Sequence, residues 1–342
     1  MSADSHFGGA RGAEVWPSRP YRIRHATAAE LERPLADNVL CAVVYGGASR
    51  FADPDIRRIY VPLKPLTPGV QGEIWESALP VRTGRYGAAE YIENGEVMLT
   101  RMSMPESDLV NTADATERIY QALTGFVERS QFPHLLRVWN YVPQINLGSG
   151  DGERYRAFTE GRFRVLSQRP GFERRLPAAT AIGPAAGRFI VFAMSARIPG
   201  QAIENPQQIS AYRYPRTYGM RSPSFARAML VPWADGAELL VSGTASIVGH
   251  ATAHPGDARA QLDQTMANLN ALVRQPGLAR RPFLPERYTL YLRDAEDYTS
   301  LYPPIQKYFG DRPFLILVGD ICRRELMLEI EVTYRLPQFL NK

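Results

Sequence analysis

The chain repeats one order of predicted elements, and this repetition limits the folds that are open to it. In each half, hydrophobic periodicity predicts a helix, a strand, a second helix and a closing apolar strand. In the first half these elements cover residues 109–128, 135–145, 151–167 and 189–195. In the second half they cover residues 257–273, 288–292, 295–309 and, as two strands, 314–318 and 326–334. Duplication of one α/β unit explains this order better than coincidence does.

Three more strands are predicted outside the repeated order, over residues 39–45, 58–63 and 239–248. A chain of 342 residues is long enough for two lobes, each with its own core. We therefore predict an α/β fold of two β-sheet plus helix lobes. Its parts are an N-terminal arm (1–35), a supporting lobe (36–196) and a lobe that carries the chemistry (197–342).

The last predicted strand carries two glutamates on one face. Side chains alternate along a strand, so Glu329 and Glu331 point the same way, roughly 6.5–7 Å apart, and Met327 shares their face. When the closing strands of the two halves are aligned, Val191 and Ala193 stand at these positions. A glutamate enclosed by apolar groups has a raised pKa, as a general acid near pH 7 requires. A solvated polar face of a half-buried strand would show the same pattern.

A second candidate region, residues 210–227, combines aromatic rings with guanidinium groups, which suit a planar carboxylated ring. Its tyrosines and arginines are Tyr212, Tyr214, Tyr218, Arg213, Arg216, Arg221 and Arg227. Strand alternation would put Tyr212 beside Tyr214, and Arg227 lies in an apolar run where it would need an anion. A basic loop over a sheet edge would look similar. On the predicted helix over 151–167, Tyr155 and Arg162 are two turns apart and share a face, which is a weak signal alone.

Composition excludes several classes of protein. The formal net charge of +5 comes without a run of Lys or Arg, which favours a small anionic ligand over nucleic acid. No apolar stretch reaches the length of about 18 residues that a membrane span needs. Two distant cysteines indicate reduced thiols in the cytoplasm, and Cys322 precedes two arginines that would lower its thiol pKa if it were exposed. His250 and His254 find no third ligand, so no metal site is predicted.

Several segments of the second half resemble the RidA (YjgF) family. They are VSGTASIV (241–248), DARAQLDQTMANLNALV (257–273), YTLYLRDAEDYTSLYPPIQKYF (288–309) and LMLEIEVTY (326–334). Together with AYRYPRTYGMRSPSFARA (211–228), the pattern is closer to the chorismatases, whose chains have this length and contain a degenerate RidA-like first half. The resemblance covers nearly the whole chain after about residue 35. It implies two RidA-like lobes of the bacterial chorismate mutase-like type.

The resemblance also implies roles for individual residues. Glu329 matches the catalytic glutamate, and Cys322 matches a cysteine of members that make hydroxybenzoates. Substrate contacts would come from Tyr155, Arg162, Tyr214 and Arg227, with Tyr212 as an alternative to Tyr214. RidA deaminases hold a carboxylate with a strand arginine, where this chain has Phe314 or Leu315, so Arg221 is a further candidate for that contact.

The function implied by this resemblance is cleavage of the enolpyruvyl ether of chorismate. Glu329 would protonate the terminal methylene, and pyruvate would leave with 3-hydroxybenzoate and, in some members, 4-hydroxybenzoate. No cofactor is expected, and the enzyme would act in the cytoplasm as a monomer or small homo-oligomer without a nucleic-acid or membrane partner. Three alternatives stay open: hydrolysis to a dihydroxycyclohexadiene carboxylate, a RidA-type imine deaminase and a non-catalytic small-molecule sensor.

Overall fold

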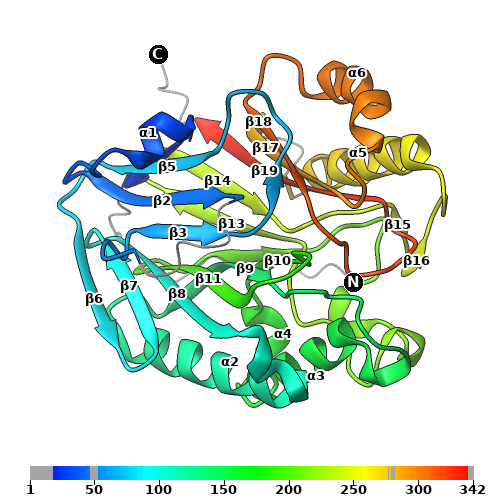
Figure 1. The fold of residues 1–342 in the computed structure, drawn as a ribbon, viewed down its shortest axis with the longest axis horizontal. Helices are drawn as coiled ribbons and strands as arrows, with labels where there is room; N and C mark the ends of the chain where they lie inside the picture. The colour runs from blue at the N-terminus through cyan, green and yellow to red at the C-terminus, as the bar shows by residue number, and fades with distance from the viewer. Residues whose placement is uncertain (1–17, 47–52, 276, 279–281, 338–342) are drawn as a thin grey trace, which may run out of the picture.

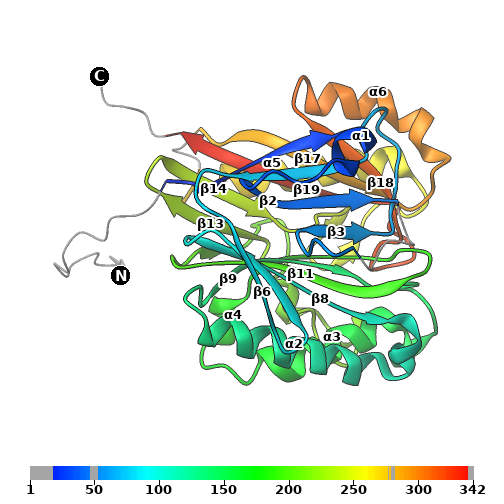
Figure 2. The ribbon, with the colours of Figure 1, turned by 60° about the vertical axis from the view of Figure 1, so that its left-hand side comes forward.

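Three β-sheets converge on one central core, with helices covering two of the sheets from outside (Figures 1 and 2). The computed structural model describes residues 18–46, 53–275, 277–278 and 282–337. The first sheet has the strand order β1-β5-β2-β3. Its elements are β1 (Tyr21–Ala26), α1 (Ala28–Glu32), β2 (Val39–Tyr45), β3 (Arg58–Val61) and β5 (Gly72–Ser77).

The second sheet has the order β10-β9-β11-β8-β7-β6, and helices α2 and α3 lie on its outer face (Figure 1). Its strands are β6 (Arg82–Tyr86), β7 (Ala89–Glu93), β8 (Val97–Pro105), β9 (His134–Tyr141), β10 (Ala178–Ile182) and β11 (Arg188–Ala196). Its helices are α2 (Thr112–Arg129), α3 (Arg154–Leu166) and α4 (Phe172–Arg175), with 3₁₀ turns η1 (Glu106–Asn111) and η2 (Gly150–Gly152).

The third sheet has the order β12-β13-β14-β19-β17-β18-β4, and α5 and α6 cover its outer face. Its strands are β4 (Lys64–Pro65), β12 (Gln201–Ile203), β13 (Ala228–Trp233), β14 (Gly236–Val241), β17 (Leu284–Leu292), β18 (Phe314–Val318) and β19 (Leu328–Pro337). Its helices are α5 (Ala258–Arg274) and α6 (Asp297–Phe309). A small hairpin of β15 (Ile247–Val248) and β16 (Ala251–Thr252) and two 3₁₀ turns, η3 (Ala211–Arg213) and η4 (Arg216–Tyr218), complete this part.

The second and third sheets follow the same plan, as the predicted duplication requires. β11 and β19 are the closing strands, each between an antiparallel partner from earlier in its lobe (β8, β14) and the strand that follows the long helix (β9, β17). β10 and β18 then add in parallel at the far side. The α/β class with two equivalent lobes is therefore confirmed.

The first sheet adds a third, smaller copy of this plan that we did not predict. Its order β1-β5-β2-β3 repeats β8-β11-β9-β10, with the same antiparallel and parallel pairings and with α1 in the place of α2. Part of the predicted N-terminal arm, residues 21–32, lies in this unit as β1 and α1. The domain limits at residues 35 and 196 stay a prediction.

The central core explains why all three sheets hold together. Each sheet contributes large apolar side chains from its inner face, among them Trp75, Trp139, Phe192, Leu240 and Tyr291. The Trp139 and Phe192 rings stack with centroids 5.2 Å apart, and Trp75 meets Trp139 edge-on at 6.0 Å. Such rings bury large areas and favour these arrangements.

The closing strand β19 separates its two faces as the alternation predicted. Leu328, Ile330 and Val332 pack in the outer core beneath α5 and α6. Glu329 and Glu331 therefore point inward, towards the second lobe, and both are buried. The solvated alternative for this strand is wrong, because the second lobe covers the polar face.

The predicted strand over residues 239–248 is wrong in its second half. β14 ends at Val241, the pairing with β19 is interrupted at residues 242–243, and Thr244 then pairs with Ile330 as an isolated bridge before the β15–β16 hairpin. Ser242 fixes this interruption because its hydroxyl donates to the Ala226 carbonyl oxygen at 2.6 Å and accepts from the Ala179 N–H at 2.8 Å. Gly243 follows at the point where β19 comes closest.

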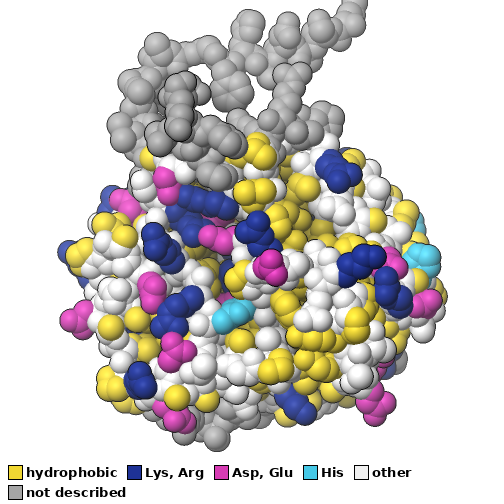
Figure 3. All heavy atoms as spheres, turned by 90° about the horizontal axis from the view of Figure 1, so that it is seen from above, with side chains coloured by type: hydrophobic (Ala, Val, Ile, Leu, Met, Phe, Trp, Pro, Cys, Tyr) yellow, Lys and Arg dark blue, Asp and Glu magenta, His cyan; other side chains and the backbone are white. Residues whose placement is uncertain are grey.

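Two further features are the hydrophobicity of the helices and the distribution of charge on the surface. Among the described residues, no helix is both long and apolar enough to cross a bilayer. The face drawn in Figure 3 shows basic and acidic side chains interspersed among apolar ones.

Gly161→Ala is expected to lower the free energy of unfolding by about 1–3 kcal/mol. Gly161 lies where α3 packs on α2, and a Cβ there would overlap the Ala113 carbonyl oxygen and lie 2.7 Å from the Thr116 Cβ. Gly125→Ala on α2 is the matched control, because its Cβ would meet only the flexible Arg129 side chain, at 3.2 Å. This control should stabilise the helix by about 0.5–1 kcal/mol. Chemical denaturation of both variants checks the prediction, and equal effects would contradict it.

Candidate active site

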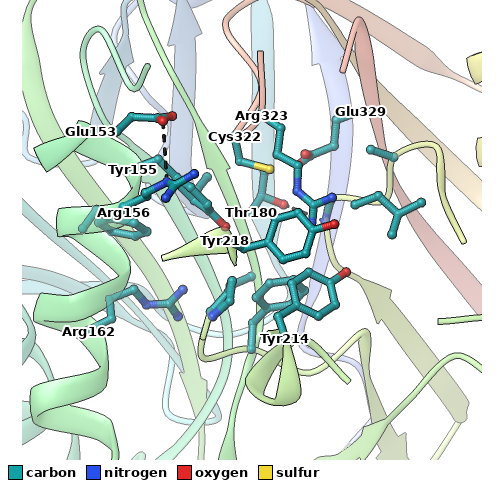
Figure 4. Close-up of a pocket in the computed structure, with 18 of the residues that line it drawn as sticks. Glu153, Tyr155, Arg156, Arg162, Thr180, Tyr214, Tyr218, Cys322, Arg323 and Glu329 are labelled. Atoms are coloured by element: carbon teal, nitrogen blue, oxygen red, sulfur yellow. Dashed lines mark hydrogen bonds and ion pairs between the residues drawn. The ribbon is translucent and has the colours of Figure 1, made fainter. Parts of the chain in front are cut away.

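One pocket lies between the second and third lobes and collects groups from both. It has a volume of about 290 Å³, at the lower limit of the range for small-molecule sites. From the second lobe, α3 supplies Tyr155 and Arg162, and β10 supplies Thr180. From the third lobe, the pocket receives Tyr214, Tyr218, Arg227, Cys322, Arg323 and Glu329, most of which Figure 4 draws around one cavity.

Glu329 is the buried carboxyl of this pocket. Burial, followed by the neighbouring charge of Glu331, raises its pKa to about 8, although Arg137 and Arg227 act in the opposite direction. Within the described part of the chain, no group donates a hydrogen bond to this carboxyl. A Cβ on residue 243 would overlap the Glu329 carboxyl, so Gly243 is what lets the chain pass this close. A carboxyl in such a setting is protonated near neutral pH and can give its proton to a ligand.

Two buried arginines face the same pocket. The Arg162 guanidinium lies over the rings of Tyr120 and Phe158, at 4.9 and 5.5 Å, and its Nε and Nη2 atoms are buried without hydrogen-bond partners. Arg227 donates from Nη2 to the Tyr214 hydroxyl at 2.8 Å, whereas its Nε is also unpartnered. Neither arginine forms an ion pair with a carboxylate of the described residues. Buried cations of this kind suit an anionic ligand.

Cys322 lines the pocket as a neutral thiol. Burial, and then the charge of Glu329, raise its pKa to about 12, and these effects outweigh Arg323 and Arg293. The expectation that adjacent arginines would lower this pKa applied to an exposed sulfur, and here burial prevails. The thiol can therefore contact a ligand as a small polarisable group, but it is a poor nucleophile.

Of the eight predicted site residues, Tyr212 and Arg221 do not line the pocket. The alternation that paired Tyr212 with Tyr214 assumed a strand, but residues 211–213 form the 3₁₀ turn η3. Tyr212 packs instead against the core between α2, α3 and the second sheet. The Arg221 guanidinium lies over the Phe163 ring at 4.8 Å. Both residues are thus structural neighbours of the pocket, and we withdraw them as substrate contacts.

Other lining residues were missed from the sequence. The Thr180 hydroxyl accepts from Arg137 Nη2 at 2.6 Å and from the Gly243 N–H at 2.9 Å, so its own proton is left to donate. The Arg323 guanidinium lies 3.8 Å from the Tyr218 ring centroid. In the sequence, Arg323 was considered only for its effect on the pKa of the Cys322 thiol. Thr180 lies in an otherwise apolar strand, and no sequence pattern marked it as a site residue.

The described residues contain no group of three or more His, Cys, Asp or Glu side chains placed to hold a metal ion. The pocket lining offers the protonated carboxyl of Glu329, the buried guanidinium groups of Arg162 and Arg227, the Cys322 thiol, hydroxyls and aromatic rings.

Comparisons with known proteins point to one family. A family model described as "Chorismatase FkbO/Hyg5-like, N-terminal" matches residues 73–195. A 3-hydroxybenzoate synthase of Streptomyces hygroscopicus is 30% identical over 315 residues, which cover 87% of this chain and 92% of that protein. A chorismatase of Streptomyces rapamycinicus is 32% identical over 76% of this chain and 80% of its own length. A chorismatase crystal structure at 1.08 Å resolution matches with a TM-score of 0.82 and 28% identity, over 92% of this chain and 98% of that one.

Proposed function

The chain belongs to the chorismatase family, and on this premise we propose that it converts chorismate to pyruvate and 3-hydroxybenzoate, with 4-hydroxybenzoate as a possible second product. One observation carries the proposal. A buried, protonated carboxyl, Glu329, shares a pocket with Arg162 and Arg227, neither of which forms an ion pair with a carboxylate of the described residues. Chorismate has two carboxylates and an electron-rich enol ether. An acid and two cations are what such a dianion needs for binding and for protonation.

The reaction begins with transfer of the Glu329 proton to the terminal methylene carbon of the enolpyruvyl group, which becomes a methyl group. The adjacent carbon is then an oxocarbenium ion, and the ring's own hydroxyl oxygen captures it. In the cyclic ketal so formed, one ring C–O bond breaks and its oxygen becomes the carbonyl oxygen of pyruvate. The other oxygen separates from the ketal carbon, stays on the ring and takes up the proton that the hydroxyl gave up. Loss of a ring C–H proton then makes the ring aromatic. The atoms of chorismate divide between pyruvate and hydroxybenzoate without addition of water, and one proton enters as another leaves.

The environment of the pocket supports this order of events. The pKa of about 8 keeps Glu329 protonated at neutral pH until the alkene arrives. Tyr155 and Tyr214 offer aromatic surface and hydroxyls to a flat carboxylated ring. The shielded position of the carboxyl, between β19 and the second lobe, favours capture by the substrate's own oxygen over capture by water.

A pyruvate-coupled assay with chorismate, followed by mass analysis of the ring product, tests the proposal. Pyruvate together with hydroxybenzoate is the expected result. A dihydroxycyclohexadiene carboxylate as the sole ring product would assign the chain to the hydrolytic branch. Chorismate binding without pyruvate release would overturn the enzymatic proposal.

Cys322→Ala is expected to change the proportions of ring products while total pyruvate release stays within about tenfold of the wild type. The reason is that the neutral thiol lies beside Glu329 and contributes shape rather than acid or nucleophile chemistry. Cys322→Ser is the matched control, since it keeps the size of the group. Chromatography of the hydroxybenzoates measures the outcome, and unchanged proportions in both variants would remove Cys322 from the site.

We also propose that the enzyme works in the cytoplasm as a monomer or small homo-oligomer. Both cysteines are unpaired, with Cys41 buried in the core and Cys322 in the pocket, as suits a reducing compartment.

A further inference from the structure

We propose that Glu331 is a positioning residue of this site: its carboxylate, fixed by Arg137, Trp139 and Tyr291, supplies a permanent negative charge that holds Glu329 in the acid form. This inference rests on the proposed function, in which Glu329 gives the proton. Glu331 itself does not line the pocket, so it would act only through Glu329.

The two carboxyls of β19 have opposite surroundings although they share one face. Glu331 accepts hydrogen bonds from Trp139 Nε1 at 2.9 Å and from the Tyr291 hydroxyl at 3.0 Å. It also forms an ion pair with Arg137, whose Nη2 lies 3.0 Å from Oε2. Three donors thus hold the Glu331 carboxylate, whereas Glu329 receives none from the described residues. Two carboxyls held roughly 6.5–7 Å apart on a strand then divide into one anion and one acid.

The balance of buried charges around Glu331 leads to the same division. The groups that face it are Arg137, Trp139 and Tyr141 from β9, Arg287, Thr289 and Tyr291 from β17, Tyr45 from β2 and Glu73 from β5. Arg287 pairs with Glu73, and Arg137 pairs with Glu331. These two cations and two anions cancel. A charge on Glu329 would have no partner within this group of four. The cation that faces Glu329 from the pocket side is Arg227, which opposes the increase in its pKa.

Arg137 forms its ion pair with Glu331 and not with Glu329, and its Nη1 atom is buried without a hydrogen-bond partner. Its Nη2 atom lies between Glu331 and the Thr180 hydroxyl, and its guanidinium stacks 5.0 Å from the Trp139 ring centroid. The pKa of Glu329 follows this geometry: after burial, the charge of Glu331 is the next largest cause of its increase, ahead of the opposing effect of Arg137. Arg137 thus connects the fixed anion to Thr180 at the wall of the pocket.

The test is the pH dependence of chorismate turnover in Glu331→Gln. An active acid with a pKa of about 8 gives a rate that falls as the pH rises through that value. Without the charge of Glu331, and with Arg137 released, this alkaline limb should move down by about one pH unit or more. Turnover at pH 8 should fall by about fivefold or more and recover towards that of the wild type as the pH is lowered.

The double variant Arg137→Met/Glu331→Gln keeps the test decisive if the single variant folds poorly, because removing both members of a buried pair is tolerated better than removing one. Its limb should lie between those of the wild type and Glu331→Gln. A purely structural role would lower the rate at every pH without moving the limb.

Glu329→Gln separates this inference from the proposed function. If that variant is inactive and the alkaline limb stays in place in both Glu331 variants, the role of Glu331 is overturned and the proposed function stands. If Glu329→Gln keeps its activity, the proposed function itself fails.

Discussion

Glu329→Gln is expected to lower pyruvate release from chorismate by about 10²–10⁴-fold, the range that a positioned general acid contributes. Glutamine keeps the shape of the side chain and its fit beside Gly243, but its amide cannot protonate the enolpyruvyl methylene. The fold loss in rate should be largest below about pH 8 and smaller above it, where the wild-type Glu329 has itself lost the proton. Steady-state rates from the pyruvate-coupled assay measure it.

The stability of Glu329→Gln and its pH dependence show whether activity is lost because the acid is gone or because the protein is unfolded. The Glu329 pKa of about 8 lies above its ordinary value of 4.5, so the folded wild type holds this proton more tightly than the unfolded chain. The stability that it contributes is therefore fully present below about pH 4.5 and is lost as the pH rises through about 8. Glu329→Gln should remove that pH dependence and leave a folded protein.

The matched control is Glu296→Gln. Glu296 is an exposed acid of the same lobe, directly before α6, and it does not line the pocket. This variant should keep most of the activity. A Glu329→Gln protein with near wild-type rates would show that the proton comes from another group.

The residues that could be predicted from the sequence are those whose placement depends on local periodicity. β2 and β18 have the predicted bounds, because each is a compact run of β-branched and other apolar residues between turn signals. The inward position of Glu329 follows from alternation along one strand, and that of Arg162 from one helix face. In these cases a single element fixes the direction of the side chain.

Placements that depend on contacts between lobes could not be predicted in this way. Arg137 and Thr180 lie on neighbouring strands of the second sheet, and only the packing of that sheet against β19 brings them to Glu331 and to the pocket. β1 is six residues long, and its membership of a sheet depends on pairing with β5, about fifty residues later. Nothing in the local pattern reports such a partner.

The segment 210–227 illustrates a third limit. Its aromatic and basic composition drew attention to Tyr214 and Arg227, which line the pocket, but composition does not specify backbone conformation. Because η3 and η4 replace the assumed strand, Tyr212 turns to the core of the second lobe. Turn geometry decided which of two neighbouring tyrosines reached the pocket.

Arg162→Met is expected to raise the KM for chorismate by about 10²-fold or more while making the ligand-free protein more stable. Arg162 is 2% exposed and has two unpartnered nitrogens, so the free protein bears the cost of a buried charge that only an anion can offset. Loss of a buried, hydrogen-bonded charge partner weakens binding by about 2–5 kcal/mol, which gives the expected change in KM. Methionine fills a similar volume between Tyr120 and Phe158 without a charge.

Arg164→Met, two residues along α3, is the matched control and should behave in the opposite way. Arg164 is partly exposed and pairs with Asp114, Glu117 and Glu160, so its loss should lower stability slightly and leave the KM unchanged. Thermal unfolding without ligand and kcat/KM for chorismate measure both variants. If Arg162→Met bound chorismate as tightly as the wild type, or unfolded at a lower temperature, Arg162 would stabilise the fold and would not be a binding residue for a substrate carboxylate.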